Sequence, residues 1–400
     1  MIKALRNIGP GALVAAAFIG PGTVTVCTLA GVQFGTSLLW AMLLSVLATA
    51  ILQEMAARVG IVTQKGLAEI IRLQLHNPNL RIVVLTLIAM AIILGNAAYE
   101  AGNISGAVLG VEAIFGSKYV SYAPLVIGGI AFFLLFIGNY KSLERSLVSL
   151  VVVMSLSFIL TAILTGPAFV EVLKGMLIPR MPKDSLLTIV ALVGTTIVPY
   201  NLFLHASLVK EKWSSVTSLK AARNDTYFSV LLGGLVSISI MVAASGLQIE
   251  KVKNAMDLAR GLEPLYGEAA RYFLGIGLFA AGITSAVTAP LAAAYVANSI
   301  FGWKAGLKDH RFRMVWMLIL FLGLGFLSLN ITPIQIIRIA QIANGLLLPV
   351  IAVFLVWVVN RPGVLGAYKN SKFQNFLGVL IILFTLFLGI MGISKVINSL

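Results

Sequence analysis

The stretch AAFIGPGTVTV, residues 15–25, interrupts the first apolar run of the chain with Gly20, Pro21 and Gly22 and contains no charged residue. Proline removes a helix hydrogen bond and glycine permits positive φ, so the stretch predicts an unwound turn inside a membrane helix. Such a turn survives at membrane depth only where it is buried in protein or lines a wet cavity. A simple proline kink is the alternative interpretation. A second break at the corresponding position of an internal repeat would favour the unwound turn over the kink.

The composition around this stretch is typical of a polytopic membrane protein. Of 400 residues, 59% are hydrophobic and 11% are charged, and the mean hydropathy is +1.00. A helix needs about 20 mostly apolar residues to cross a hydrocarbon core about 30 Å thick. We therefore predict an all-α membrane protein with no removable signal peptide, because the first apolar run continues into further spans. Eleven transmembrane helices are expected near 11–35, 37–58, 82–109, 121–139, 146–167, 185–209, 226–248, 273–300, 314–330, 334–359 and 374–397.

The net charge of +15 indicates a membrane orientation rather than nucleic-acid binding, because the basic residues alternate between loops instead of gathering on one soluble face. With the N-terminus inside, 19 of the 29 Lys and Arg residues fall on the inner side. The positive-inside rule then places the chain in a plasma (inner) membrane, with the N-terminus cytoplasmic and the C-terminus outside. The single cysteine, Cys27, excludes an internal disulfide and a cysteine metal cluster, and we interpret it as an apolar filler.

A second break follows five spans after the first, at VPYN, residues 198–201. Two broken helices at corresponding positions are typical of transporters built from inverted repeats. We predict one transmembrane domain over 1–400, with repeat one at about 8–167, repeat two at about 185–360 and an extra helix at about 374–397. The remaining loops are too short to form a core of their own.

Five stretches in matching order then carry a resemblance to a known family. They are GPGTVTVCTLAGVQFGTSLLW (20–40), GNISGAVLG (102–110), GTTIVPYNLFLHASLV (194–209), GLFAAGITSAVTAP (277–290) and RIAQIANGLLLPVIAVFLVWVVN (338–360). The chain resembles the Nramp family of proton-coupled divalent metal transporters, which belongs to the LeuT-like structural class. The resemblance implies a LeuT-like fold with an inverted 5+5 repeat and with helices 1 and 6 broken.

The chain departs from the family at its metal-binding motifs. Nramp transporters usually carry Asp-Pro-Gly-Asn in helix 1 and Met-Pro-His in helix 6. Here Gly20 and Thr23 stand for the aspartate and asparagine, and Val198 and Tyr200 stand for the methionine and histidine. Because a dehydrated divalent ion needs anionic or soft ligands, these replacements argue against the family's usual substrate.

The expected proton pathway is also reduced. Of two acidic residues in helix 3 of the family, Glu100 matches the first, and Asn103 replaces the second. An ionisable group within a span indicates a functional site, although a protonated, hydrogen-bonded Glu100 that fixes packing is the alternative. His205 matches a family histidine and has three interpretations: a gate, a proton shuttle or a packing residue. The ninth span, 314–330, contains no Lys or Arg, so a basic partner like the one in the family's ninth helix would have to come from Arg311 or Arg313.

A sodium site is the next expectation. In sodium-coupled LeuT-like transporters an ion lies between broken helix 1 and helix 8, held by carbonyls and two adjacent hydroxyls. Helix 8 of this chain has the required spacing, and the other possibility is that its hydroxyls bond back to their own helix. The candidate ligands are Ile19, Gly20, Thr23, Ala281, Thr284 and Ser285.

The resulting prediction is an ion-coupled secondary transporter without the transition-metal site. Backbone donors at the breaks favour sodium-coupled uptake of a small anion, bicarbonate first, with Na⁺ as coupling ion and no other cofactor. A proton-coupled transporter of Mg²⁺ or Mn²⁺ is the alternative, and a non-transporting sensor is the second. No enzyme, no nucleic-acid partner and no particular oligomeric state is indicated. The substrate-binding candidates are Gly20, Pro21, Gly22, Thr23, Thr195, Thr196, Val198, Tyr200, Asn201 and Gln341, the last of which equally suits interhelical hydrogen bonding.

Overall fold

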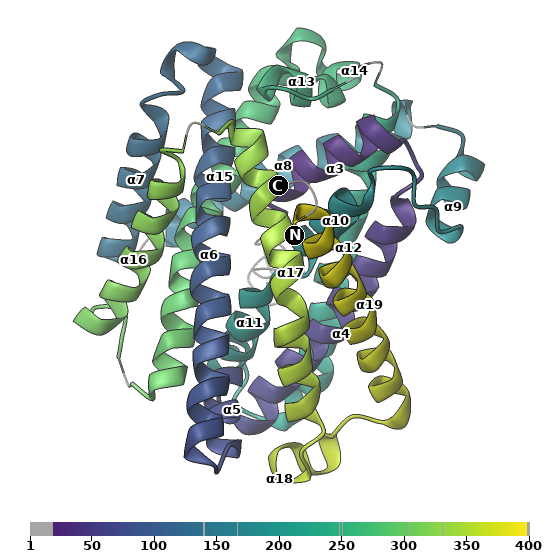
Figure 1. Ribbon diagram of the computed structural model, residues 1–400. Helices are drawn as coiled ribbons and strands as arrows, with labels where there is room; N and C mark the ends of the chain where they lie inside the picture. Colours follow the sequence, from purple (N-terminus) through teal and green to yellow (C-terminus); the bar gives the residue numbers. More distant parts are fainter. Residues whose placement is uncertain are drawn as a thin grey trace.

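A computed structural model describes residues 19–138, 141–165, 167–247, 249, 251–303, 305–329 and 331–397. In these residues all regular structure is helical, which confirms the predicted all-α class (Figure 1). The α-helices are α3 Pro21–Phe34, α4 Leu39–Thr63, α5 Leu67–Gln74, α6 Pro78–Phe115, α7 Ala123–Ile137, α8 Lys141–Thr165, α9 Phe169–Leu177, α10 Leu186–Thr196, α11 Pro199–Lys212, α12 Leu219–Ser245, α13 Ala255–Ala259, α14 Glu263–Tyr266, α15 Ala270–Phe301, α16 His310–Phe326, α17 Pro333–Val359, α18 Pro362–Leu365 and α19 Lys372–Ile397. Short 3₁₀ turns are η1 Ser117–Tyr119, η2 Val216–Ser218, η3 Arg260–Leu262, η4 Gly267–Ala269 and η5 Gly366–Tyr368.

Each predicted span overlaps a helix, and the break predicted within 185–209 separates α10 from α11. Residues 11–18 of the first span lie outside the described residues. Eight helical segments of the described chain are long and apolar enough to cross a membrane, and α7 is a shorter apolar helix. The count of eleven spans therefore stays a prediction.

Two long central helices, α6 and α17, begin at strong local signals. The Asn77 side chain accepts hydrogen bonds from the first turn of α6, and Pro78 follows at the first helical position. Thr332 and Gln335 form a capping box at the start of α17, again with a proline next. These caps satisfy donors that would otherwise lack partners, so both helices start at defined points.

Small residues allow α6 to approach its neighbours closely. A side chain at Gly106 would collide with the ring of Pro21, and one at Gly102 would press on Ala340 of α17. At Gly110 an added carbon would meet the backbone of α15, which runs beside α6 (Figure 1). The break in the first helix is thus held against α6 by the fit of a proline ring on a glycine.

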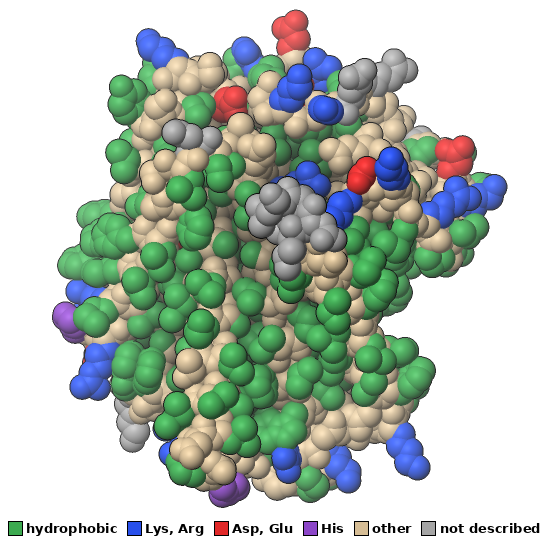
Figure 2. All heavy atoms as spheres, in the orientation of Figure 1, with side chains coloured by type: hydrophobic (Ala, Val, Ile, Leu, Met, Phe, Trp, Pro, Cys, Tyr) green, Lys and Arg blue, Asp and Glu red, His purple; other side chains and the backbone are tan. Residues whose placement is uncertain are grey.

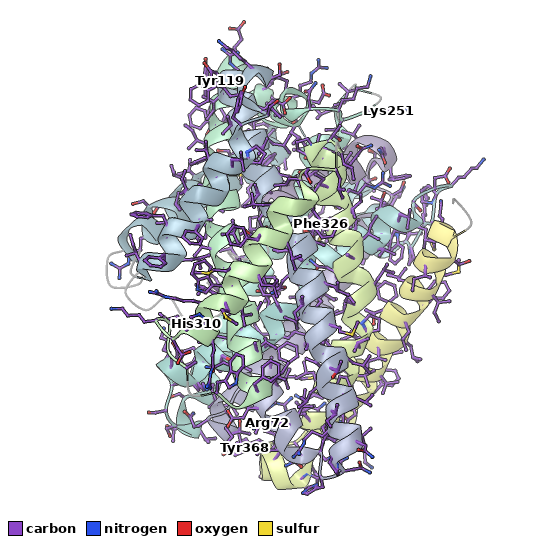
Figure 3. All side chains as sticks on the ribbon, turned by 60° about the vertical axis from the view of Figure 1, so that its left-hand side comes forward. Arg72, Tyr119, Lys251, His310, Phe326 and Tyr368 are labelled. Carbon is purple, nitrogen blue, oxygen red and sulfur yellow. The ribbon has the colours of Figure 1, made fainter. Side chains whose placement is uncertain are left out.

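The outer surface of the bundle is apolar between two charged ends. Hydrophobic side chains cover much of the middle of the face in Figure 2, whereas Lys and Arg lie mainly toward its ends and edges and Asp and Glu are seen only in its upper part. Arg72 and Tyr368 lie at one end of the bundle, and Tyr119 and Lys251 lie at the other (Figure 3). This distribution is the one that a bilayer requires of a spanning protein.

A buried ion network joins three parts of the chain at the Tyr368 end. Arg58 of α4 donates to Glu54 Oε2 at 3.0 Å and to Asn370 Oδ1 at 2.7 Å. Its second terminal nitrogen donates to the Tyr368 carbonyl at 2.9 Å, and Arg223 of α12 donates to Glu54 Oε1 at 2.7 Å. The network therefore fastens α4 to α12 and to the connection before α19.

Candidate functional site

The first break exposes the start of a helix inside the protein. Gly20 is extended, with φ −106° and ψ −173°, and α3 begins at Pro21 with no side-chain cap. The Gly20 carbonyl accepts the first helix bond, from Val24 N at 3.2 Å. The first turn of any helix presents N–H groups without intrahelical acceptors, and it forms the positive end of the helix dipole.

The second break presents the C-terminal end of one helix, α10, as well as the N-terminal end of the next, α11. α10 ends at Thr196, Ile197 and Val198 are non-helical, and α11 begins at Pro199. The last carbonyls of a helix have no intrahelical donors, so the buried end of α10 presents the negative end of a dipole. The second predicted break therefore exists between α10 and α11, and at the first the structure describes the start of α3, whereas residues 11–18 of that span lie outside the described residues.

Side chains bring the two breaks together. The hydroxyls of Thr23 on α3 and Thr195 on α10 lie 2.9 Å apart and are buried. The amide of Gln341 on α17 lies directly over Gly22, where a side chain would collide with it and would also press on Thr195. Four of the predicted substrate-binding residues, Gly22, Thr23, Thr195 and Gln341, thus form one cluster drawn from three helices.

Several buried polar atoms around the breaks have no hydrogen-bond partner. Both amide atoms of Asn201 lack a partner, as does Oε1 of Gln341, and each residue is 1% exposed. Asn344, one turn beyond Gln341, has an unpartnered Nδ2. Buried polar atoms are normally paired, so such groups mark places where an ion or water belongs. The unpartnered amide oxygens are hard ligands of the kind that Mg²⁺ and Mn²⁺ accept.

The other candidates at the second break are buried, and the Tyr200 hydroxyl has no hydrogen-bond partner. Thr196 donates to the Leu192 carbonyl at 2.8 Å and lies 3.6 Å from the sulfur of Met42 on α4. Val198 is fully buried. The ring of Tyr200 meets Tyr99 of α6 edge to face, with centroids 5.4 Å apart.

Glu100 and Asn103 contact each other on α6. Asn103 Nδ2 donates to Glu100 Oε2 at 3.4 Å, and Oε1 of this fully buried carboxyl has no partner. The Glu100 stem packs on Gly323 of α16. The two arginines considered as basic partners contact aromatic rings instead: Arg313 lies 4.3 Å from the Phe136 centroid, and Arg311 lies 5.9 Å from that of Trp303.

His205 is linked to α4 rather than to Glu100. Its Nδ1 lies 2.8 Å from Gln53 Oε1, and its Nε2 is buried without a partner. Gln53 was not among the sequence candidates. A polar residue inside the apolar span 37–58 is the signal that identifies it, because such residues in membrane helices face protein or a cavity.

The predicted sodium site lies between helix 1 and helix 8, and helix 8 is α15 in the structure. Thr284 donates its hydroxyl proton to the Ala280 carbonyl at 2.8 Å, and Thr288 repeats this bond to Thr284. Ser285 is buried. The threonine donor is thus used within its own helix, as in the alternative considered for this residue. In the described residues no three His, Cys, Asp or Glu side chains form a metal-binding group.

Comparison with solved structures identifies the class of protein. The crystal structure of the Eremococcus coleocola manganese transporter, in complex with an aromatic bis-isothiourea substituted compound, matches with a TM-score of 0.77 at 21% identity, covering 97% of this chain and 86% of that chain. Mhp1, a nucleobase-cation-symport-1 family transporter in a closed conformation, matches with a TM-score of 0.59 at 14% identity, covering 98% and 93%. The fold is that of a LeuT-like membrane transporter.

The sequence comparisons identify the family. The family model "Natural resistance-associated macrophage protein-like" matches residues 11–395. The divalent metal cation transporter MntH of Erwinia tasmaniensis is 27% identical over 387 residues, which cover 94% of this chain and 91% of that protein. The chain belongs to the Nramp family. The predicted resemblance is confirmed, and so is the prediction that the protein is a transporter rather than an enzyme.

These comparisons contradict the predicted substrate and coupling ion. Sodium-coupled uptake of bicarbonate or another small anion is wrong, because the relatives are named for divalent metal cations. That prediction rested on the missing side-chain ligands at 20, 23 and 198 and on the backbone donors at the positive helix end of α3. The buried carbonyl end of α10 and the amide oxygens of Asn201 and Gln341 have the opposite preference, because they attract cations.

Proposed function

We propose that this protein transports a divalent metal cation, Mg²⁺ or Mn²⁺, across the membrane. The observation that carries the proposal is similarity along almost the whole chain to relatives named divalent metal cation transporters, with 94% of the chain covered in the first case. Family membership over residues 11–395 supports it further.

The cluster at the two breaks is the proposed cation site. Its oxygens come from the end of α10, from the amides of Asn201 and Gln341 and from the Thr23 and Thr195 hydroxyls. All of these are neutral, and neither a carboxylate nor a thioether stands at 20, 23 or 198. A neutral oxygen site suits a hard cation that keeps several of its waters, and it disfavours softer transition metals.

The proposed architecture follows the alternating access of inverted-repeat transporters. Repeat one is about 8–167, repeat two is about 185–360, and α19 lies outside both. The N-terminus is placed in the cytoplasm and the C-terminus outside an inner membrane, because the tail and loops then on the inner side, including those near 58–81 and 361–372, carry 19 of the 29 Lys and Arg residues. The Tyr368 end of the bundle is then cytoplasmic.

Replacing Asn201 with alanine is expected to slow Mn²⁺ uptake about tenfold at subsaturating concentration. A contact between an amide and a charged group is worth about 1.5–3 kcal/mol, and about 1.4 kcal/mol is a factor of ten. The measurement is the initial rate of Mn²⁺ uptake into proteoliposomes, with Mg²⁺ as competitor. Asn79→Ala is the matched control, because Asn79 is an exposed amide at the end of α6, and it should transport like the unmodified protein.

The same assay decides the proposed function. Uptake of Mn²⁺ or Mg²⁺ by the unmodified protein above that of protein-free liposomes supports it. If neither ion moves, while binding of Mn²⁺ still raises the melting temperature, the chain is a sensor rather than a transporter. Equal rates for Asn201→Ala and Asn79→Ala would remove Asn201 from the cation site.

Proton coupling is proposed to depend on Glu100. Its carboxyl is fully buried, one oxygen bonds to Asn103 and the other has no partner. Glu100→Gln keeps the shape and removes the titratable proton, so we expect uptake to lose its response to an imposed pH gradient. The measurement compares Mn²⁺ uptake with and without a one-unit inward proton gradient. The exposed Glu268→Gln is the control, and a gradient response retained by Glu100→Gln would contradict the assignment.

A further inference from the structure

A groove of about 370 Å³ lies on the outside of the bundle, between the start of α6 and the end of α17. Leu80 and Val84 of α6 form one wall, and Val353 and Trp357 of α17 form the other. Leu80 is 51% exposed and Val353 is 42% exposed, so the apolar walls open outward rather than into the core. None of these residues belongs to the cation site.

The mouth of the groove is cationic and polar. Arg361 lies at the end of the α17 wall with its guanidinium 4.6 Å from the centroid of the Trp357 ring. His76, in the connection between α5 and α6, and Gln74, the last residue of α5, line the same mouth. No acidic residue is among the described residues that line the groove. The groove therefore combines apolar walls with a mouth that attracts negative charge.

The position of the groove matches the edge of a bilayer. α6 begins at Pro78 and α17 ends at Val359, so the groove mouth lies where two spanning helices leave the apolar region. These helix ends lie beside α5 and α18 at the lower end in Figure 1, where Figure 2 shows Lys, Arg and a histidine below hydrophobic side chains. Arg72 and Tyr368 lie at this same end (Figure 3).

We propose that this groove binds an anionic phospholipid. The phosphate lies at Arg361 and His76, and an acyl chain lies along Leu80 and Val353. The charge of the mouth favours a negative headgroup over a zwitterionic one, and the apolar walls favour a lipid over a free phosphate. Because α6 carries Glu100 and α17 carries Gln341, one bound lipid fastens the end of the helix proposed for proton coupling to the end of a helix that lines the proposed cation site.

The test measures lipid binding to the purified full-length protein in detergent, by native mass spectrometry and by melting temperature. Phosphatidylglycerol is titrated against phosphatidylcholine, with glycerol phosphate as the chain-free probe. We expect phosphatidylglycerol alone to bind and to raise the melting temperature. Arg361→Gln should weaken its binding about fivefold, which corresponds to about 1 kcal/mol for one basic residue near an anionic headgroup.

Arg271→Gln is the matched control, because Arg271 also lies 4.6 Å from an aromatic centroid, that of Tyr272, and is exposed away from the groove. It should bind phosphatidylglycerol like the unmodified protein. Val353→Trp fills the groove without changing its charge and should also abolish binding. The proposal is overturned if phosphatidylcholine or glycerol phosphate binds as well as phosphatidylglycerol, if Arg361→Gln and Arg271→Gln behave alike, or if Val353→Trp leaves binding unchanged.

Discussion

Replacing Glu54 with alanine is expected to lower the free energy of unfolding by about 3–5 kcal/mol, because it leaves a buried guanidinium without its counterion. Arg58 is 1% exposed, and its two remaining acceptors, the Tyr368 carbonyl and Asn370 Oδ1, are neutral. Arg223 loses the same carboxylate, although its side chain is 38% exposed and regains water. The measurement is an unfolding titration of the detergent-solubilised protein.

A double variant separates loss of charge pairing from loss of packing. Glu54→Gln with Arg58→Met removes both buried charges and nearly keeps the side-chain volumes. It should therefore recover most of the stability lost in Glu54→Ala, because a buried ion pair can often be replaced by apolar groups at little cost. A double variant as unstable as the single one would show that the charges are not the cause.

The control is an ion pair of similar length on the surface. Lys395 lies 2.8 Å from Asp184, but the two side chains are 37% and 71% exposed. Asp184 also has a positive φ of 65°, which asparagine tolerates better than alanine does. Solvent and salt screen such pairs, so Asp184→Asn should leave the unfolding transition unchanged within error. If Asp184→Asn and Glu54→Ala gave equal effects, burial would not be what makes the Glu54 network important.

The local part of the fold could be predicted from the sequence because its signals are local. Apolar length located the spans, and the Gly20-Pro21-Gly22 and Val198-Pro199 sequences located the breaks, since glycine and proline act on the backbone wherever they stand. The spacing of the breaks then indicated a transporter with inverted repeats, and the resemblance to the Nramp family implied the LeuT-like class, which the comparisons confirm.

The pairing of helices could not be predicted in the same way. Membrane helices are apolar around their whole circumference, so hydrophobic periodicity does not tell which face meets which neighbour. Glu54 and Arg58 are four residues apart and readable as a helix pair, whereas the bond from Arg58 to Asn370 spans 312 residues. The contact of Gln53 with His205 has the same origin in tertiary packing.

The substrate prediction failed for a different physical reason. The prediction combined the missing ligands at 20, 23 and 198 with the backbone donors at the first break, and it gave too little weight to the carbonyl end of α10 at the second break. Which end of a broken helix faces the site decides whether a cation or an anion is preferred, and this depends on three-dimensional direction rather than on residue type.

Replacing Gly194 with alanine is expected to have the largest effect at the site itself. The added carbon would collide with the Gln341 carbonyl of α17 and would approach Gly345 N at 2.6 Å. The backbone cannot change conformation locally as a flexible side chain can, so α10 must shift away from α17. This shift lowers the free energy of unfolding by about 1–3 kcal/mol or more. That movement separates Thr195 from Gln341, the two residues that meet over Gly22.

We therefore expect Gly194→Ala to lose most Mn²⁺ uptake per folded molecule as well as stability, measured as initial uptake rate normalised to the monodisperse fraction. Gly129→Ala is the matched control, because Gly129 also lies within an apolar helix, α7, but has open space around the added carbon. It should transport normally. Gly194 contacts α17 at Gln341, a residue of the proposed cation site. If Gly194→Ala transports like Gly129→Ala, the α10–α17 contact does not shape the site.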